Sequence, residues 1–143
     1  MRDLHSNIGV IEAIPPAVYD ADNSPAAIDL LGFDAAEIVI HVGIGGITFT
    51  GTNKIEFVLS HSDDESAYAP VTVSDLLGVA SVTNGIVLAF KTAHAAATLH
   101  RLGYIGGRRY LKLLADFGGT HGTGTPLSAT VIKGHAASRP VAA

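Results

Sequence analysis

The chain has 143 residues, which is enough for one domain with its own core and too few for two. Charged residues make up 15% of the sequence, against about 25% in an ordinary soluble domain, and the net charge is −4 with no basic block. This balance argues against a nucleic-acid partner, which needs a positive surface. The absence of cysteine excludes disulfides and thiolate metal sites, and no apolar run approaches the roughly 18 residues of a membrane span.

The low charge has a consequence for assembly. Few charged side chains remain to cover the surface of a lone soluble domain, so we expect part of the outer surface to be buried against other subunits. The alternative is that the surface is rich in Ala and Gly, which are only weakly apolar, so that the low share of charged residues needs no burial against other subunits.

The first sixteen residues predict an extended N-terminal arm. Ile8–Ile14 is at most a weak strand, and Pro15-Pro16 rules out a helix through that point. Because Met1–Asn7 is polar and Glu12 interrupts the apolar stretch after it, this segment is not a signal peptide, and we expect a soluble protein.

Short strands separated by turn residues follow. In chain order they are predicted over residues 17–20, 26–31, 38–42, 47–50, 54–62, 68–73, 86–90 and 99–105. The segment 54–62 has the clearest pattern, because Ile55, Phe57 and Leu59 share one side, as in a half-buried antiparallel strand. One helical turn is predicted at 74–78.

The stretch 104–135 predicts a long antiparallel hairpin. Its two apolar runs, Arg109–Phe117 and Leu127–Lys133, flank a Gly- and Thr-rich loop at 118–126 that is too long for a two-residue turn. Alternation places four side chains of the first run in the core: Leu111, Leu113, Ala115 and Phe117. The last residues, 135–143, have no pattern and predict a C-terminal tail.

Eight or nine short strands without a long amphipathic helix predict an all-β fold, a single antiparallel β-sandwich or barrel. We therefore expect a sandwich domain over residues 17–134, with the arm 1–16 before it and the tail 135–143 after it. The tail buries too little to offset roughly 1–2 kcal/mol per residue of backbone entropy. If it is ordered, it is expected to lie against a neighbouring chain.

No constellation for catalysis or metal binding emerges from the sequence. The loop Gly119–Thr125 lacks the following helix and the Lys-Ser/Thr pair of a phosphate loop. The seven histidines show no metal-ligand spacing, and the best cluster is His61 beside Asp63 and Asp64, with His121 as a further neighbour in space. We interpret this cluster as a solvated acidic turn, and we predict no metal, no cofactor and no enzymatic activity.

Cationic side chains offer candidate contacts to a partner. Arg108 and Arg109 stand at the start of the 109–117 strand, where an Arg pair is either solvated or docked onto acidic residues of another protein. Together with a loop histidine and the tail arginine, they form the set of predicted partner contacts: Arg108, Arg109, His121 and Arg139.

Two stretches resemble a known family. They are Asn53–Asp64 (NKIEFVLSHSDD) and Gly103–Leu113 (GYIGGRRYLKL), the latter followed by Gly122–Ala129 (GTGTPLSA) and the closing Lys133-Gly134. This order of elements is similar to that of the small capsid cement or decoration proteins of tailed bacteriophages, above all the podophage type with a jelly-roll fold. The resemblance covers about two thirds of the chain, from Asn53 on.

The resemblance implies a non-enzymatic virion protein with a jelly-roll β-sandwich. Such proteins lie on the outer surface of the capsid, bind the major capsid protein, bridge neighbouring capsomers and self-associate as dimers or trimers. This chain would be made in the host cytoplasm. Two alternatives stay open: another small virion component, such as a head spike or tail protein, and a carbohydrate-binding β-sandwich at a virion surface. The absence of Trp counts against a sugar site, which usually needs aromatic platforms.

Overall fold

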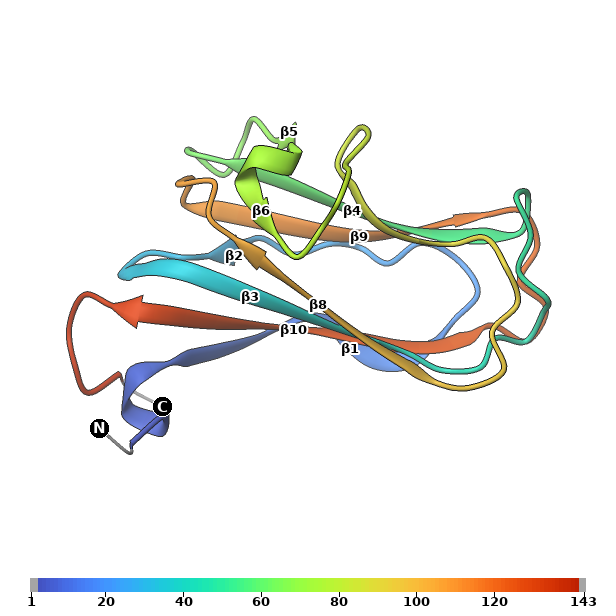
Figure 1. Cartoon of the computed structure of the whole chain (residues 1–143), viewed down its shortest axis with the longest axis horizontal. Coiled ribbons are helices and arrows are strands. Elements are labelled where there is room, and N and C mark those ends of the chain that lie inside the picture. The colour runs from blue at the N-terminus through green and yellow to red at the C-terminus, as the bar shows by residue number, and fades with distance from the viewer. Residues whose placement is uncertain (1–2, 142–143) are drawn as a thin grey trace.

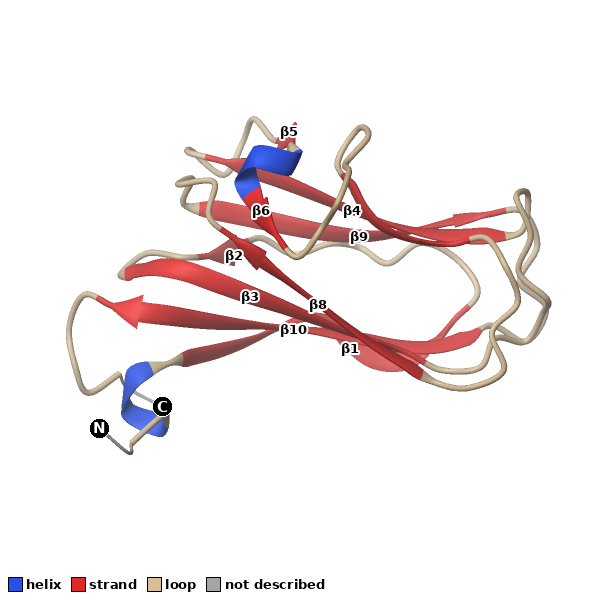
Figure 2. Ribbon diagram, viewed as in Figure 1, coloured by secondary structure: helices blue, strands red, loops and turns tan. Residues whose placement is uncertain are grey.

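The chain folds into two antiparallel β-sheets that pack face to face, as Figures 1 and 2 show. The computed structural model describes residues 3–141. The strands are β1 (Gly9–Tyr19), β2 (Ile28–Asp29), β3 (Phe33–Val42), β4 (Lys54–Ser62), β5 (Ala69–Pro70), β6 (Leu76–Leu77), β7 (Ile86–Phe90), β8 (Thr98–Tyr104), β9 (Tyr110–Gly118) and β10 (Thr125–Ala136). Two 3₁₀ turns, η1 (His5–Asn7) and η2 (Val73–Asp75), are the helical elements of this described part, and neither is long enough to cross a membrane.

The connections make the sandwich a jelly roll. One sheet has the order β1-β10-β3-β8-β6, the other has the order β2-β9-β4-β5, and β7 pairs with β4. When the short β5 and β6 are set aside, eight strands remain, and each except β4, whose successor β7 pairs with it, is followed by a strand of the opposite sheet. This is the eight-stranded, double-sheet arrangement of a jelly roll, and it confirms the predicted all-β antiparallel sandwich.

Side chains that alternate along the central strands fill the space between the sheets. One layer comes from β4 and β9: Ile55, Phe57, Leu59, Leu111, Leu113 and Ala115, all buried as predicted. The opposite layer comes from β3 and β10: Ile38, Ile40, Val42, Leu127, Ala129 and Val131. Phe117 is only partly buried, at the edge of this core. Full burial of one such aliphatic or aromatic side chain contributes roughly 1.5–3 kcal/mol, so these two layers hold the sheets together.

The predicted hairpin at 104–135 is wrong. β9 lies between β2 and β4 in one sheet, whereas β10 lies between β1 and β3 in the other. The Gly- and Thr-rich loop therefore crosses from sheet to sheet, and Gly119, Gly122 and Gly124 adopt positive φ angles along it. A hairpin and a crossover need the same two apolar runs, so the local pattern does not distinguish them.

The predicted N-terminal arm is also wrong, because residues 9–16 belong to β1. Pro15-Pro16 is tolerated because β1 is the edge of its sheet, and the β1–β10 register slips between Ile14 and Ala17. The sandwich thus begins at Gly9 rather than at residue 17.

The predicted tail begins too early, since β10 continues to Ala136. Beyond it the chain is held by its own subunit: the backbone N–H of Ala137 donates to the carbonyl of Gly32, and that of Val141 donates to the carbonyl of Ser6. Residues 1–2 and 142–143 of the predicted arm and tail lie outside the described residues.

Smaller differences concern short elements. The strand predicted at 26–31 is reduced to Ile28–Asp29, and 68–73 is reduced to Ala69–Pro70. The segment 47–50 is not a strand, and the helical turn predicted at 74–78 is η2 at Val73–Asp75.

Leu113→Ala should destabilise the protein by about 2–5 kcal/mol, because it opens a cavity between the sheets. Urea denaturation followed by circular dichroism measures this change in unfolding free energy. The matched control is Leu31→Ala at an exposed position, for which a change within about 0.5 kcal/mol is expected. Equal losses for the two variants would contradict the assignment of the core.

Gly124→Ala should destabilise the crossover loop. Gly124 has φ near +85°, and an added Cβ would lie 2.8 Å from the carbonyl oxygen of Tyr19, so we expect a loss of roughly 1–3 kcal/mol. Gly51→Ala is the control, because an added Cβ at Gly51 has open space around it. Thermal melting of both variants is the measurement, and an unchanged melting temperature for Gly124→Ala would show that the loop is not fixed.

Candidate docking site

The outer side of the β1-β10-β3-β8 sheet consists mainly of apolar and uncharged polar residues, and we call it the smooth face. Its residues are those that alternate with buried ones on β3, β8 and β10 and those of β1 in register with them: Val10, Glu12, Val18, Ala35, Glu37, Val39, His41, Leu99, Arg101, Gly103, Pro126, Ser128, Thr130, Ile132 and Gly134. Three of them are charged. Arg101 and Glu37 form an ion pair at 3.3 Å, which leaves Glu12 as the other charged residue of the set.

A groove of about 650 Å³ crosses the smooth face at the end opposite to η1. Its walls come from four strands or their ends, at residues 16–18, 41–43, 97–99 and 126–128, and none of these residues is an Asp, Glu, Lys or Arg. Val18 and Leu99 in its walls are 61% and 59% exposed. Exposed apolar side chains that gather in a groove are typical of a surface that binds another protein.

The outer side of the other sheet differs, because it carries several charged side chains. Glu56 binds both Lys54 and Lys91 at 2.7 Å, and these hydrogen bonds, first from Lys54 and then from Lys91, lower the pKa of Glu56. Lys112 lies over the ring of Tyr68 at 4.3 Å. These charged side chains are thus held in ion pairs or over an aromatic ring.

Arg109, a predicted partner contact, is held within its own subunit. Its guanidinium donates two hydrogen bonds to Asp29, at 2.8 and 2.7 Å, and lies over the ring of Tyr110. The hydrogen bond from Arg109 lowers the pKa of Asp29 to about 2. This bidentate pair fastens the two-residue strand β2 to the start of β9.

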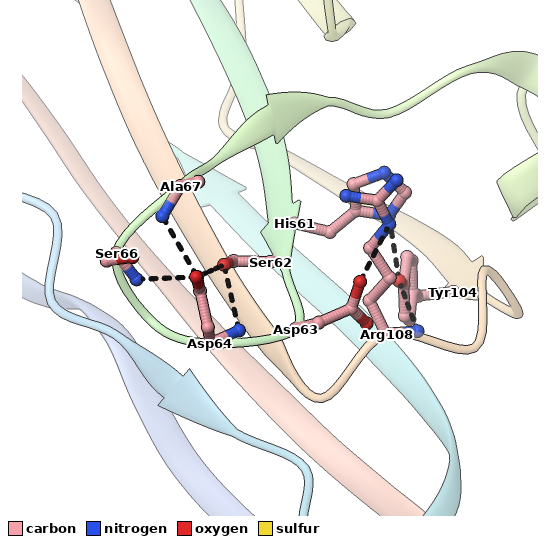
Figure 3. Close-up of polar contacts among 8 residues, drawn as sticks. All are labelled: His61, Ser62, Asp63, Asp64, Ser66, Ala67, Tyr104 and Arg108. Carbon is pink, nitrogen blue, oxygen red and sulfur yellow. Dashed lines mark hydrogen bonds and ion pairs between the residues drawn. The ribbon is translucent and has the colours of Figure 1, made fainter.

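Arg108 is held more loosely, at one end of a polar network shown in Figure 3. Its Nε lies 3.9 Å from Asp63, and its backbone N–H donates to the hydroxyl of Tyr104. That hydroxyl is hydrogen-bonded to Nδ1 of His61 at 2.9 Å. Burial, followed by the charge of Arg108, lowers the pKa of His61, so the imidazole is neutral near pH 7.

The suspected cluster of His61, Asp63 and Asp64 is a folded turn. Asp64 accepts hydrogen bonds from the backbone N–H groups of Ser66 and Ala67 and from the hydroxyl of Ser62, as Figure 3 shows. The two backbone bonds, first that of Ala67, lower the pKa of Asp64. Residues 3–141 contain no group of three His, Cys, Asp or Glu side chains that could hold a metal ion.

The prediction of His121 as a partner contact is wrong, because its side chain is buried. Its Nε2–H donates to the carbonyl of Gly118, and its ring packs edge-on against Phe117 at 4.7 Å. Arg139 is exposed beyond the end of β10. The side chains of Arg108 and Arg109 are 39% and 41% exposed, and Arg108 is the less tightly paired of the two.

His121 belongs to a cluster of aromatic rings that sequence reasoning missed. The cluster joins three histidines and three phenylalanines from the loops at one end and from β7, β8 and β9: Phe49, Phe90, His94, His100, Phe117 and His121. Each histidine has one buried ring nitrogen without a hydrogen-bond partner. These residues are far apart in sequence and follow no regular spacing, so the cluster could not be predicted from the sequence.

Comparisons with known proteins give a limited result. No family model and no curated protein matches the chain. Among solved structures, the chain is similar to the SPBc2 prophage-derived protein YomS, with a TM-score of 0.45 and 11% identity over 89% of this chain and 92% of that one. It is also similar to the coat protein of Tobacco streak virus, with a TM-score of 0.35 and 11% identity over 96% of this chain and 93% of that one. At these TM-scores and identities, neither likeness carries an inference about function.

Protonation of His100 should destabilise the fold. Burial, followed by the charge of His94, lowers the pKa of His100 from its ordinary value of 6.5, so the unfolded chain takes up a proton before the folded one does. The stability that depends on neutral His100 is therefore complete above about pH 6.5 and declines as the pH falls toward the lowered folded-state value.

His100→Phe keeps a ring against Phe90 and removes this proton. Between pH 6.5 and 5 the variant should lose stability less steeply than the wild type, by no more than about 1.4 kcal/mol per pH unit, the limit for one proton. Urea denaturation at several pH values measures both slopes, with pH 8 as the reference at which they should agree. Identical slopes below pH 6.5 would contradict the role of His100.

Proposed function

We propose that this chain is a structural virion protein, a cement or decoration protein that binds the outside of a phage head and bridges neighbouring major capsid proteins. The observation that carries the proposal is the apolar groove on the smooth face, whose lining contains no Asp, Glu, Lys or Arg and exposes Val18 and Leu99. A surface of this kind is suited to lasting contact with other proteins.

The sequence resemblance supports the choice of a cement protein. The resembling stretches 53–64 and 103–113 include β4 and the first part of β9, which are hydrogen-bonded neighbours from Lys54↔Gly118 to Ser62↔Tyr110. The third stretch, 122–129, includes the start of β10. The resemblance therefore covers connected parts of the sandwich and not scattered segments.

The polar groups that attract attention in the sequence have structural tasks, which supports a non-enzymatic role. His61 binds Tyr104, Asp64 closes its own turn, and Glu56 is held between two lysines. None of these groups is left poised to transfer a proton or attack a substrate.

A carbohydrate-binding function has less support. Sugar rings stack on open aromatic faces, but here Arg109 lies over Tyr110 at 4.7 Å and Lys112 lies over Tyr68 at 4.3 Å. A head spike or tail protein would share the fold, so the position in the particle separates that alternative from a cement protein.

The proposal predicts that the purified protein co-sediments with phage heads from which it has been removed. Binding should saturate, and it should raise the temperature at which the heads release their DNA. Cryo-electron microscopy of the same particles should place the protein over the joints between capsomers. Binding to tails alone, or no binding to heads, would overturn the proposal.

Arg108 and Arg139 are proposed as capsid contacts, because both are accessible and Arg108 is only loosely paired. The double variant Arg108→Ala/Arg139→Ala should weaken head binding and make it less dependent on salt, as expected for charges at the rim of an interface. Lys91→Ala is the control, since Lys91 is already paired with Glu56. The test is to measure binding curves at about 50 and 500 mM salt, roughly below and above physiological ionic strength. Identical curves for the wild type and the double variant would exclude the two contacts.

A further inference from the structure

We propose that the side chains of Asp22 and Asn23 close one edge of the β2-β9-β4 sheet against strands of other chains, because they take the place of a neighbouring strand along β9. We call these two residues the edge cap. The inference goes beyond the proposed function and does not depend on it, since it concerns the sheet that does not carry the smooth face and holds wherever the protein acts.

β9 has a neighbouring strand along its whole length on one side, but only at its start on the other. β4 pairs with all nine residues of β9, whereas β2 pairs with only the first two. Among the described residues, no strand continues the β2 side of this pairing over 112–118. Because alternate residues of a strand direct their backbone groups to the same edge, those of Leu113, Ala115 and Phe117 face this open side.

The segment between β1 and β2, the blue trace that leads toward β2 in Figure 1, supplies the missing partners. Nδ2 of Asn23 donates to the carbonyl of Leu113 at 3.2 Å, and Oδ1 of Asn23 accepts from the backbone N–H of Ala115 at 2.7 Å. A carboxamide offers the same N–H donor and C=O acceptor as a peptide group, so this side chain makes the bonds that a neighbouring strand would make. Asp22 adds a third bond, in which its Oδ1 accepts from the N–H of Phe117 at 2.7 Å.

Asn23 is fixed in this position by its burial. It is 9% exposed, whereas Asp22 and Ser24 on either side of it are exposed. A buried carboxamide is costly unless its donor and its acceptor are both bound, and here both are bound to β9. Residues 20–27 include no large apolar side chain that could anchor the segment in the core. The contact of this segment with β9 therefore depends on the edge cap.

Without the edge cap, the edge of β9 would be a place for unwanted pairing. β9 buries Leu111, Leu113 and Ala115 on its inner face, and an uncovered edge of such a strand is a template for the strand of another molecule. The outer strand of the other sheet, β1, is interrupted in a different way, by Pro15-Pro16 and by slips in register. Each sheet thus has an edge that is protected by its own means.

Amide hydrogen exchange followed by NMR tests whether the edge cap covers β9. In the wild type, the N–H groups of Ala115 and Phe117 should exchange slowly, although no described strand lies beside them. Asn23→Ala should speed exchange at Ala115 about tenfold, and Asp22→Ala should do the same at Phe117. Asp22→Asn keeps an oxygen acceptor and should preserve the slow exchange at Phe117. The control is the amide of Leu114, which faces β4 by alternation and should not change.

Unchanged exchange at Ala115 in Asn23→Ala and at Phe117 in Asp22→Ala would overturn the inference. Because Asp22 is exposed, its variants should fold even if the loss of the Asn23 amide prevents folding. Circular dichroism checks the fold of each variant before exchange is measured.

The effect on association is tested at a protein concentration at which the wild type stays in solution. The double variant Asp22→Ala/Asn23→Ala should form sedimenting aggregates that bind thioflavin T, about ten times faster than Val131→Ala does. Val131 is buried in the opposite sheet, so Val131→Ala weakens the core while the edge cap stays in place. Each variant is held equally far below its own melting temperature. Equal rates would attribute aggregation to lost stability alone and would overturn the inference, as would a double variant that stays in solution.

Discussion

The unbroken pairing of β4 with β9 is the constraint on which the rest of the structure depends. Nine consecutive residue pairs run from Lys54↔Gly118 to Ser62↔Tyr110 without a slip in register. A slip of one residue would turn every inward side chain of one strand to the outside. Because this ladder fixes which side of the sheet is apolar, it also fixes where the opposite sheet packs, and hence which of its sides is left facing outward.

Sequence reasoning succeeds where a strand carries its own burial pattern, and it fails where pairing is decided by distant strands. Ile55, Phe57 and Leu59 could be placed in the core from alternation alone. The partner of β10 could not, because β1 and β3 compete with β9 for its edges and only the assembled core decides among them. The prolines at residues 15 and 16 suggest that a strand ends there. At a sheet edge, however, the missing backbone N–H of proline faces no partner strand, so the strand can continue.

The same limit applies to the candidate site. Arg109 is hydrogen-bonded to Asp29, which lies 80 residues earlier in the chain. This contact exists because β2 pairs with β9, and no local spacing in the sequence predicts it. His121 stands in a stretch of Gly and Thr that is typical of an exposed loop, yet its ring is buried among phenylalanines of other segments. The composition predicts a surface buried against other subunits, but it does not say which side of the sandwich carries the apolar groove with Val18 and Leu99.

The meeting of the two chain ends has a practical consequence. Ser6, before the start of β1, and Val141, after the end of β10, are joined by a backbone hydrogen bond. The apolar groove lies at the other ends of these two strands. Peptides or domains fused genetically to the two ends of the chain would therefore project side by side from the same end of the sandwich. A short linker between the ends would also allow circular permutation, with new termini opened in the exposed turn at Gly51 and Thr52. The fold is therefore a convenient carrier for displaying foreign sequences in pairs.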